Sequence, residues 1–279
     1  MTAGLADSHL HIFRNGMPSG SGRPVLGNDS EIEAYEAFRR VHGIVAGLVV
    51  GYEGDGIDPG NNSYIRSLAA SHPWMATLAN VSGQAPLEPT AAERLLREGH
   101  AGLAVYLPDA AAGTTLADWP AETWRILAAH RAILSLNARP AAAAAAAPAI
   151  RRQGECRFVF SHLGLPGRLA TVPGPAEAAN RIAALLAMAG LDQVMVKISG
   201  LYAVSDPPHG YPHPAAAPFI ELLLDRFGPS RCLWGSDFSP ALEFVSFPQT
   251  LTIPYLGGLS PGEHDRVMGG NLLKLLGRS

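Results

Sequence analysis

Two histidines near the N-terminus are separated by one residue, in the run Asp7-Ser8-His9-Leu10-His11. If this run is a β-strand, the two imidazoles point to the same side of it, about 7 Å apart along the strand. Paired imidazoles in this arrangement can bind a metal ion or polarise a carbonyl group. Taken alone, the pattern is equally compatible with two histidines on the surface of a strand.

Two further polar side chains follow apolar runs later in the chain. His162 comes after the run at residues 157–160, and Asp237 comes after the run at residues 232–234. A lone histidine at such a place is more often structural, and an aspartate there often caps a helix. Together with His9 and His11, however, they form a set of three imidazoles and one carboxylate. Asp237 can serve such a set as a general base, and all four side chains can hold Zn²⁺ if a metal is bound.

The elements that must position these residues alternate along the whole chain. Short apolar, strand-like runs are separated by helix-like segments, and these runs begin at Leu5, Gly43, Trp74, Gly102, Ala132, Arg157, Val194 and Cys232. Such alternation predicts a parallel α/β fold, either a closed barrel or a doubly wound sheet. Eight repeats, and no glycine-rich phosphate motif after the first strand, favour a (β/α)8 TIM barrel formed by residues 1–279 as a single domain. Catalytic groups of such barrels lie at the carboxyl ends of the strands.

Composition limits the classes of function. The chain has 279 residues, of which 47% are apolar and 16% charged, and its net charge of −3 argues against a nucleic-acid surface. Two cysteines, Cys156 and Cys232, do not make a disulfide framework. No apolar run reaches the roughly 18 residues of a membrane span, and no signal region opens the chain. We therefore expect a soluble, cytoplasmic protein that does not act on a membrane.

Other polar side chains are candidates for contacts with a small-molecule substrate. Lys197 interrupts an apolar strand, where an unpaired ammonium group would be costly, so it is expected to bind an anionic partner or the substrate. The alternative is a lysine on the outer face of the strand, paired with a helix carboxylate. Tyr202, Tyr52, Tyr106 and Asn137 lie near other strand ends and are expected to line a pocket.

The segment from Ser205 to Pro214 is a long, proline-rich connection after the seventh strand. It falls on the same face as the candidate residues and could act as a lid. His209 and His213 are four residues apart, the spacing of a helical metal pair, but the prolines argue against a helix here. We expect a loop without a metal ion.

The four candidate residues and several longer segments resemble the amidohydrolase superfamily. Its branch of pyrone-dicarboxylate lactonases and sugar-acid lactonases, such as L-fuconolactonase, is similar over essentially the whole chain. The resemblance rests on residues 61–73 (NNSYIRSLAASHP) and on SHLGLPG, VKISGLY, LWGSDF and GGNLLKLLG. It implies a TIM barrel with His9, His11, His162 and Asp237 at the active site. It also implies that this branch can work without a metal, whereas other branches use Zn²⁺.

The chain departs from the pattern of the family at substrate-binding positions. Ala104 stands where members often have an arginine that grips a substrate carboxylate. Ser161 precedes His162 where members often have aspartate, and Phe238-Ser239-Pro240 replaces Trp-Pro-His. The resemblance therefore implies intact chemistry on a different substrate, and the missing arginine favours a neutral or singly charged sugar lactone over a dicarboxylate.

The leading prediction is hydrolysis of a lactone by general-base attack of water. Asp237 would take the proton from water, and His9, His11 and His162 would stabilise the charge on the carbonyl oxygen. Lys197 would hold a hydroxyl or carboxylate of the substrate. No cofactor is required in this scheme, although Zn²⁺ on the same residues would suit a decarboxylase or hydratase. A lactone isomerase and a non-catalytic sugar-acid binding protein are further alternatives. The sequence as a whole is compatible with a homo-oligomer.

Overall fold

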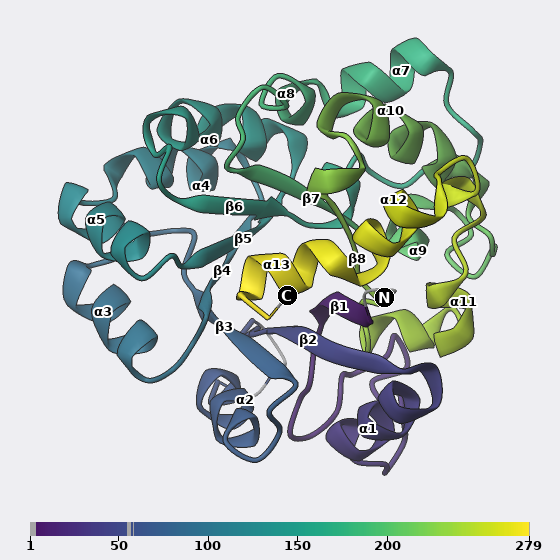
Figure 1. The fold of residues 1–279 in the computed structure, drawn as a ribbon, viewed down its shortest axis with the longest axis horizontal. Helices are drawn as coiled ribbons and strands as arrows, with labels where there is room; N and C mark the ends of the chain where they lie inside the picture. The colour runs from purple at the N-terminus through teal and green to yellow at the C-terminus, as the bar shows by residue number, and fades with distance from the viewer. Residues whose placement is uncertain (1–3, 55–56, 58, 279) are drawn as a thin grey trace.

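The strands form one parallel sheet whose order follows the chain. The computed structural model describes residues 4–54, 57 and 59–278, and in it each of the eight strands pairs in parallel with the next. This arrangement confirms the predicted (β/α)8 barrel (Figure 1). The strands are β1 (Leu5–Leu10), β2 (Ile44–Val50), β3 (Met75–Val81), β4 (Gly102–Leu107), β5 (Ile133–Ala138), β6 (Arg157–Phe160), β7 (Val194–Ile198) and β8 (Cys232–Trp234).

Most of the helices surround the strands on the outside (Figure 1). The longer ones are α1 (Glu31–His42), α2 (Asn61–Ala69), α3 (Pro89–Arg97), α5 (Ala121–Ala129), α6 (Pro140–Arg152) and α10 (Ala217–Phe227). The shorter ones are α4 (Ala110–Thr115), α7 (Pro175–Arg181), α8 (Ala183–Leu186), α9 (Leu201–Val204), α11 (Phe247–Leu251), α12 (Pro261–Asp265) and α13 (Asn271–Leu276). None of the helices in the described part of the chain combines the length and the apolar character of a membrane span.

The C-terminal helix α13 closes the end of the barrel at which the strands begin. Its Leu272 is buried with the apolar side chains of the barrel interior. Arg157, the first residue of β6, donates a hydrogen bond to the carbonyl of Leu275, and Arg278 donates to Trp74 and Met75 at the start of β3. Figure 1 shows this helix lying across the middle of the ring of strands. The opposite end, where the strands finish, is therefore left for a site.

The barrel closes where the chain beyond β8 meets β1. The backbone N–H of Asp237 donates to the carbonyl of His9 at 2.8 Å, and that of His11 donates to the carbonyl of Phe238. Leu10 and Phe238 form a parallel bridge between the same two segments. This closure places Asp237 beside His9, although 228 positions separate the two residues in the chain.

A bulge in β1 decides which side chains of this strand face inward. Asp7 lies opposite Gly47 and Leu10 opposite Val49, so β1 uses three residues where β2 uses two. One extra residue reverses the alternation of a strand. Ala6 therefore packs in the barrel interior, whereas Leu10 packs in the outer layer against the helices. Asp7 also faces outward, although it is an even number of residues from the inward-facing His9.

Candidate active site

The structure brings His9, His11, His162 and Asp237 together at the carboxyl end of the barrel. The Nε2 atoms of His9 and His11 are 3.2 Å apart, and they lie 3.6 and 3.7 Å from Asp237 Oδ1. His162 Nδ1 lies 3.8 Å from the other carboxylate oxygen, and its ring centroid is 4.5 Å from that of His9. All four side chains are buried. They therefore form one compact cluster, drawn from β1 and the residue just beyond it, from the turn after β6 and from the segment after β8.

Hydrogen bonds define which nitrogen of His11 carries its proton. His11 Nδ1 lies 2.8 Å from the backbone carbonyl oxygen of Val50, which can only accept a hydrogen bond. The proton of a neutral His11 is therefore on Nδ1, and its Nε2 presents a lone pair toward His9 and Asp237. Ser199 Oγ lies 3.1 Å from His162 Nδ1 and orients that ring in turn.

Lys197 lies behind His9, at the centre of the barrel. Its Nζ is 3.0 Å from His9 Nδ1 and donates to Ser135 Oγ at 2.8 Å. The side chain is fully buried, which lowers the pKa of the ammonium group to about 7 in spite of the opposing charges of Asp237 and Asp7. No helix carboxylate among the described residues pairs with it, so the alternative of an outward-facing lysine is wrong.

Burial also perturbs the acid and base character of the cluster. Loss of solvent raises the pKa of Asp237 to about 6, while His11, the Tyr202 hydroxyl and Lys197 act in the opposite direction. Tyr202, on α9, donates to Asp237 Oδ2 at 2.7 Å. Burial lowers the pKa of His11 to about 4 and that of His162 to about 3, and it lowers the pKa of His9 well below its usual value. At neutral pH the cluster therefore contains neutral imidazoles and an ionised, weakly stabilised carboxylate.

A cavity of about 230 Å³ opens above this cluster. Its lining includes three of the histidine and aspartate side chains, namely His11, His162 and Asp237. The remaining lining residues are Phe13, Met17, Tyr52, Tyr106, Asn137, Tyr202 and Pro240. All four polar residues expected near a pocket therefore lie in it, while Lys197 and Ala104 do not reach its wall. In this geometry Lys197 contacts His9 rather than a molecule in the cavity.

The backbone at the site is held in unusual conformations. His162 has φ of 50° and Asp237 has φ of 57°, in the left-handed region that is unfavourable for residues other than glycine. Such strain persists only where the surrounding structure imposes it, and it concentrates at functional sites. Two glycines make room for the cluster. A Cβ on Gly200 would lie 2.4 Å from His162 Nδ1, and one on Gly235 would lie 2.7 Å from His9 Cβ.

Several supporting residues were missed by the sequence reasoning. The carboxylate of Asp7 accepts hydrogen bonds from the backbone N–H groups of His9 and Ser236 and from the hydroxyls of Ser236 and Tyr35. It therefore ties β1 to the segment after β8 and to α1. Burial raises its pKa to about 6, although all four hydrogen bonds oppose this. Its place inside the His9 motif was the only available signal.

Glu31 and Asn61 hold the rim of the cavity. Glu31, the first residue of α1, accepts hydrogen bonds from the backbone of Phe13 and Met17 and from the Ser239 hydroxyl. Asn61, the first residue of α2, donates to the carbonyl of Ile12 and accepts from the backbone N–H of Tyr52. Both are buried polar residues at helix starts, where sequence reasoning sees only ordinary caps.

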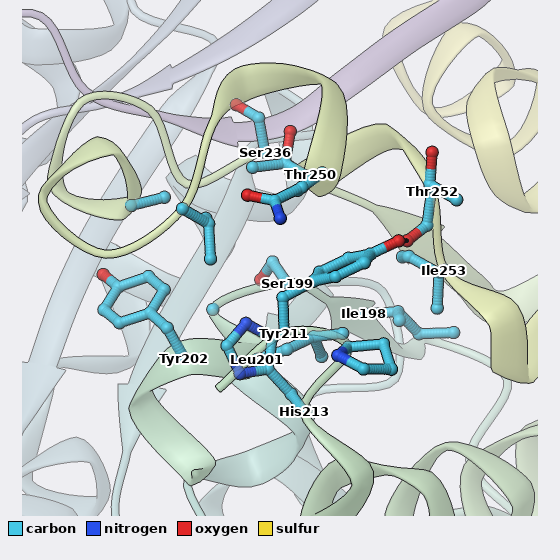
Figure 2. Close-up of a pocket in the computed structure, with 16 residues that line it drawn as sticks. Ile198, Ser199, Leu201, Tyr202, Tyr211, His213, Ser236, Thr250, Thr252 and Ile253 are labelled. Atoms are coloured by element: carbon cyan, nitrogen blue, oxygen red, sulfur yellow. Dashed lines mark hydrogen bonds between the residues drawn. The ribbon is translucent and has the colours of Figure 1, made fainter. Parts of the chain in front are cut away.

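The proline-rich loop lies over a second, much smaller cavity of about 30 Å³ (Figure 2). Tyr211 and His213 from the loop line it together with Ser199 and Tyr202, so Tyr202 borders both cavities. The space suffices for a water molecule, and the buried Nδ1 of His213 has no hydrogen-bond partner in the described structure. The loop therefore packs beside the site; its predicted role as a lid stays a prediction.

The cluster has the spacing of a metal site but not the proton positions. His9, His162 and Asp237 each offer one ligand atom, and these atoms lie within 4.8 Å of one another. Lys197 Nζ, however, lies 3.0 Å from His9 Nδ1, and in its ammonium form it donates there, which leaves the proton of a neutral His9 on Nε2. A protonated nitrogen has no lone pair for a metal ion. With Lys197 in its ammonium form, His9 therefore does not fit a metal ion as a ligand.

Comparisons with known proteins agree with this architecture. An amidohydrolase from Burkholderia multivorans with bound zinc has 21% identity and a TM-score of 0.78, with 99% of each chain covered. A probable 2-pyrone-4,6-dicarboxylic acid hydrolase from Acinetobacter baumannii with citric acid bound has 16% identity and a TM-score of 0.75, covering 99% of this chain and 100% of that one. At these identities the likeness shows the fold.

A 5-carboxyvanillate decarboxylase from Novosphingobium aromaticivorans, complexed with manganese and a nitrobenzoic acid, is more distant. It has 11% identity and a TM-score of 0.64, covering 99% of this chain and 96% of that one. No curated protein matches the chain. The amidohydrolase family model matches residues 6–278, nearly the whole length. The chain therefore belongs to the amidohydrolase family, and the predicted superfamily is confirmed.

Proposed function

We propose that the protein is a hydrolase that opens a lactone, with Asp237 as the general base and without a metal ion. The observation that carries the proposal is the buried Asp237 carboxylate at the floor of the cavity, whose pKa of about 6 leaves it ionised yet basic at neutral pH. A base with a pKa near the working pH is the most effective. Membership of the amidohydrolase family supports a hydrolase.

The attacking water is positioned by Asp237. Its Oδ1 carries lone pairs and the residue lines the cavity, so one water can donate a hydrogen to it. The oxygen of this water then keeps a lone pair for the carbonyl carbon. As the new C–O bond forms, a proton of the water passes to Asp237. His162 lines the same cavity and is the candidate donor to the carbonyl oxygen, which gains negative charge.

Collapse of the tetrahedral intermediate completes the reaction. The ring C–O bond breaks, and Asp237 returns its proton to the departing alkoxide oxygen, so the product is a hydroxy acid. Tyr202 supports the return because its hydroxyl stabilises the ionised form of Asp237 at 2.7 Å. Water and lactone are thereby converted without any redox change or further reactant.

The lining of the cavity favours a small, neutral, hydroxylated substrate. Tyr52, Tyr106, Tyr202 and Asn137 offer polar groups for hydroxyls, whereas no arginine or lysine is among the described lining residues. A dicarboxylate would enter without a cationic partner, which is costly in a confined site. The volume of about 230 Å³ also falls below the roughly 300–1,000 Å³ of pockets for drug-sized ligands. We therefore propose a neutral sugar lactone rather than a pyrone dicarboxylate.

The test is proton release by the purified protein on a panel of sugar-derived and pyrone lactones, before and after chelation. We expect turnover of a neutral lactone that survives chelation and falls by about 10²- to 10⁴-fold in Asp237→Asn. Asp225→Asn, at an exposed carboxylate of α10, is the matched control and should keep full activity.

Other outcomes would contradict the proposal in recognisable ways. Silence across the whole panel would refute lactone hydrolysis. Loss of turnover on chelation would instead support a metal-dependent hydrolase or decarboxylase on the same barrel. A rearranged lactone in place of the hydroxy acid would identify an isomerase.

A further inference from the structure

The side chain of Lys197 contacts His9 but does not line the cavity. We propose that Lys197 is a positioning residue that fixes the proton of His9 on Nε2 and so keeps the cluster from binding a divalent metal ion. This role of Lys197 deepens the proposed metal-free hydrolysis and rests on it. The tautomer of His9 and the metal affinity of the cluster can both be measured without a substrate.

Both ends of a short hydrogen-bond chain have a fixed direction. At one end, the ammonium group of Lys197 has donors only, and its Nζ lies 3.0 Å from His9 Nδ1. At the other end, the carbonyl oxygen of Val50 has lone pairs only, and it lies 2.8 Å from His11 Nδ1. Between them, the Nε2 atoms of His9 and His11 are 3.2 Å apart. His9 Nδ1 must accept and His11 Nδ1 must donate.

With Lys197 charged and both rings neutral, only one arrangement of protons satisfies this chain. His9 accepts at Nδ1 and therefore carries its proton on Nε2, from which it donates to the lone pair of His11 Nε2. Each of the three contacts then has one donor and one acceptor. The opposite tautomer of His9 would place two hydrogens between Lys197 and Nδ1, and two lone pairs would face each other between the histidines. Lys197 thus selects the tautomer.

The selected tautomer removes one ligand from the candidate metal set. His9, His162 and Asp237 are the described residues whose ligand atoms come within 4.8 Å of one another. Histidine binds a metal through an unprotonated nitrogen, and His9 has none while Lys197 donates to Nδ1. In addition, the positive charge of the buried ammonium group would repel a dication bound beside His9. In its ammonium form, the lysine supplies a positive charge in place of a metal ion.

The surroundings of Lys197 hold it in this role. Ser135 on β5 accepts a second hydrogen bond at 2.8 Å, and the lysine side chain is fully buried. Ser135 also offers a matched control. Its replacement by alanine removes a partner of the lysine but leaves the contact between Nζ and His9 Nδ1. Lys197→Met keeps a long apolar side chain and removes the donor.

The experiment combines nitrogen NMR of the imidazoles with zinc titration, in the absence of substrate. At a pH of about 6, where Lys197 is charged, we expect the His9 proton on Nε2 in the wild type and in Ser135→Ala. In Lys197→Met, we expect Nε2 to lose its fixed proton and the affinity for Zn²⁺, measured by competition with a chromophoric chelator, to rise on the order of 10- to 100-fold. If Lys197 contributed to packing alone, Lys197→Met would change neither the tautomer of His9 nor the affinity for Zn²⁺.

Several results would overturn the inference. A wild-type His9 protonated on Nδ1 would do so directly, even if Lys197→Met did not fold. Equal zinc affinity of the wild type and Lys197→Met would do so as well, and so would an equal gain in Ser135→Ala. None of these readouts depends on lactone turnover, so failure of the proposed hydrolysis and failure of this inference are separable.

Discussion

Tyr202→Phe offers the sharpest test of how the structure sets the basicity of Asp237. The change removes one hydroxyl, which donates to Asp237 Oδ2 at 2.7 Å, and leaves the ring that packs on Phe244. A hydrogen bond to a charged group contributes about 1.5–3 kcal/mol, and one pH unit corresponds to about 1.4 kcal/mol. Because the hydroxyl stabilises the ionised carboxylate, its loss should raise the pKa of Asp237 from about 6 by about one pH unit.

The effect on the rate depends strongly on pH. At pH 6 the ionised fraction of Asp237 would fall from about one half to about one tenth, whereas at pH 8 it would stay near 90% or above. We therefore expect kcat/KM to drop about fivefold at pH 6 and to change little at pH 8 from this cause. The acidic limb of the pH profile should move to higher pH by the same amount.

Two assays check this prediction. The pH dependence of kcat/KM gives the limb once a substrate is known, and ¹³C NMR of the Asp237 carboxyl gives its pKa without a substrate. Tyr52→Phe is the control, because Tyr52 lines the same cavity without a hydrogen bond to Asp237. An unchanged or lowered pKa of Asp237 in Tyr202→Phe would refute the assigned role of this hydroxyl.

Two stability predictions follow from the buried charges. The pKa of Lys197 in the folded state, about 7, is below its ordinary value of 10.5, so between these values the unfolded chain binds the proton more strongly and stability rises with pH. Relative to Lys197→Met, the free energy of unfolding of the wild type should increase by about 2 kcal/mol from pH 7 to pH 9, measured with urea; a constant difference would contradict a buried, titrating lysine. Asp7→Ala should cost about 3 kcal/mol or more, because it leaves the buried donors of His9, Ser236 and Tyr35 without an acceptor; an unfolding midpoint like that of the wild type would show that this carboxylate does not hold the strands.

Local patterns in the sequence were sufficient to predict the barrel. Each strand is an apolar run between turn signals, and hydrophobic burial on both faces requires just such runs in a parallel sheet. Differences appear where packing overrides propensity. The apolar segment after Pro175 forms two short helices, α7 and α8, rather than one, and the C-terminal helical stretch contains a π-helical turn at Arg266–Gly270. Such breaks depend on neighbouring elements and leave little trace in the periodicity.

The sequence by itself also determined which residues meet at the site. His9 and His11 share a face because strand side chains alternate, and His162 and Asp237 join them because all parallel strands of a barrel end at the same rim. Only the tertiary structure decided the rest. Asp7 has the same parity as His9, yet the bulge in β1 turns it outward to Tyr35. A bulge depends on pairing with a distant strand, which no local pattern encodes.

The role of Lys197 was likewise decided by long-range contacts. The sequence marked it as a buried cation in need of a partner, and a substrate was the natural candidate. In the structure its partners are His9 and Ser135, which lie 188 and 62 positions away in the chain. Distances of about 3 Å between such residues result from the closure and stagger of the barrel. The sequence therefore determined the chemistry available at the site, and the tertiary structure decided which proton each group holds.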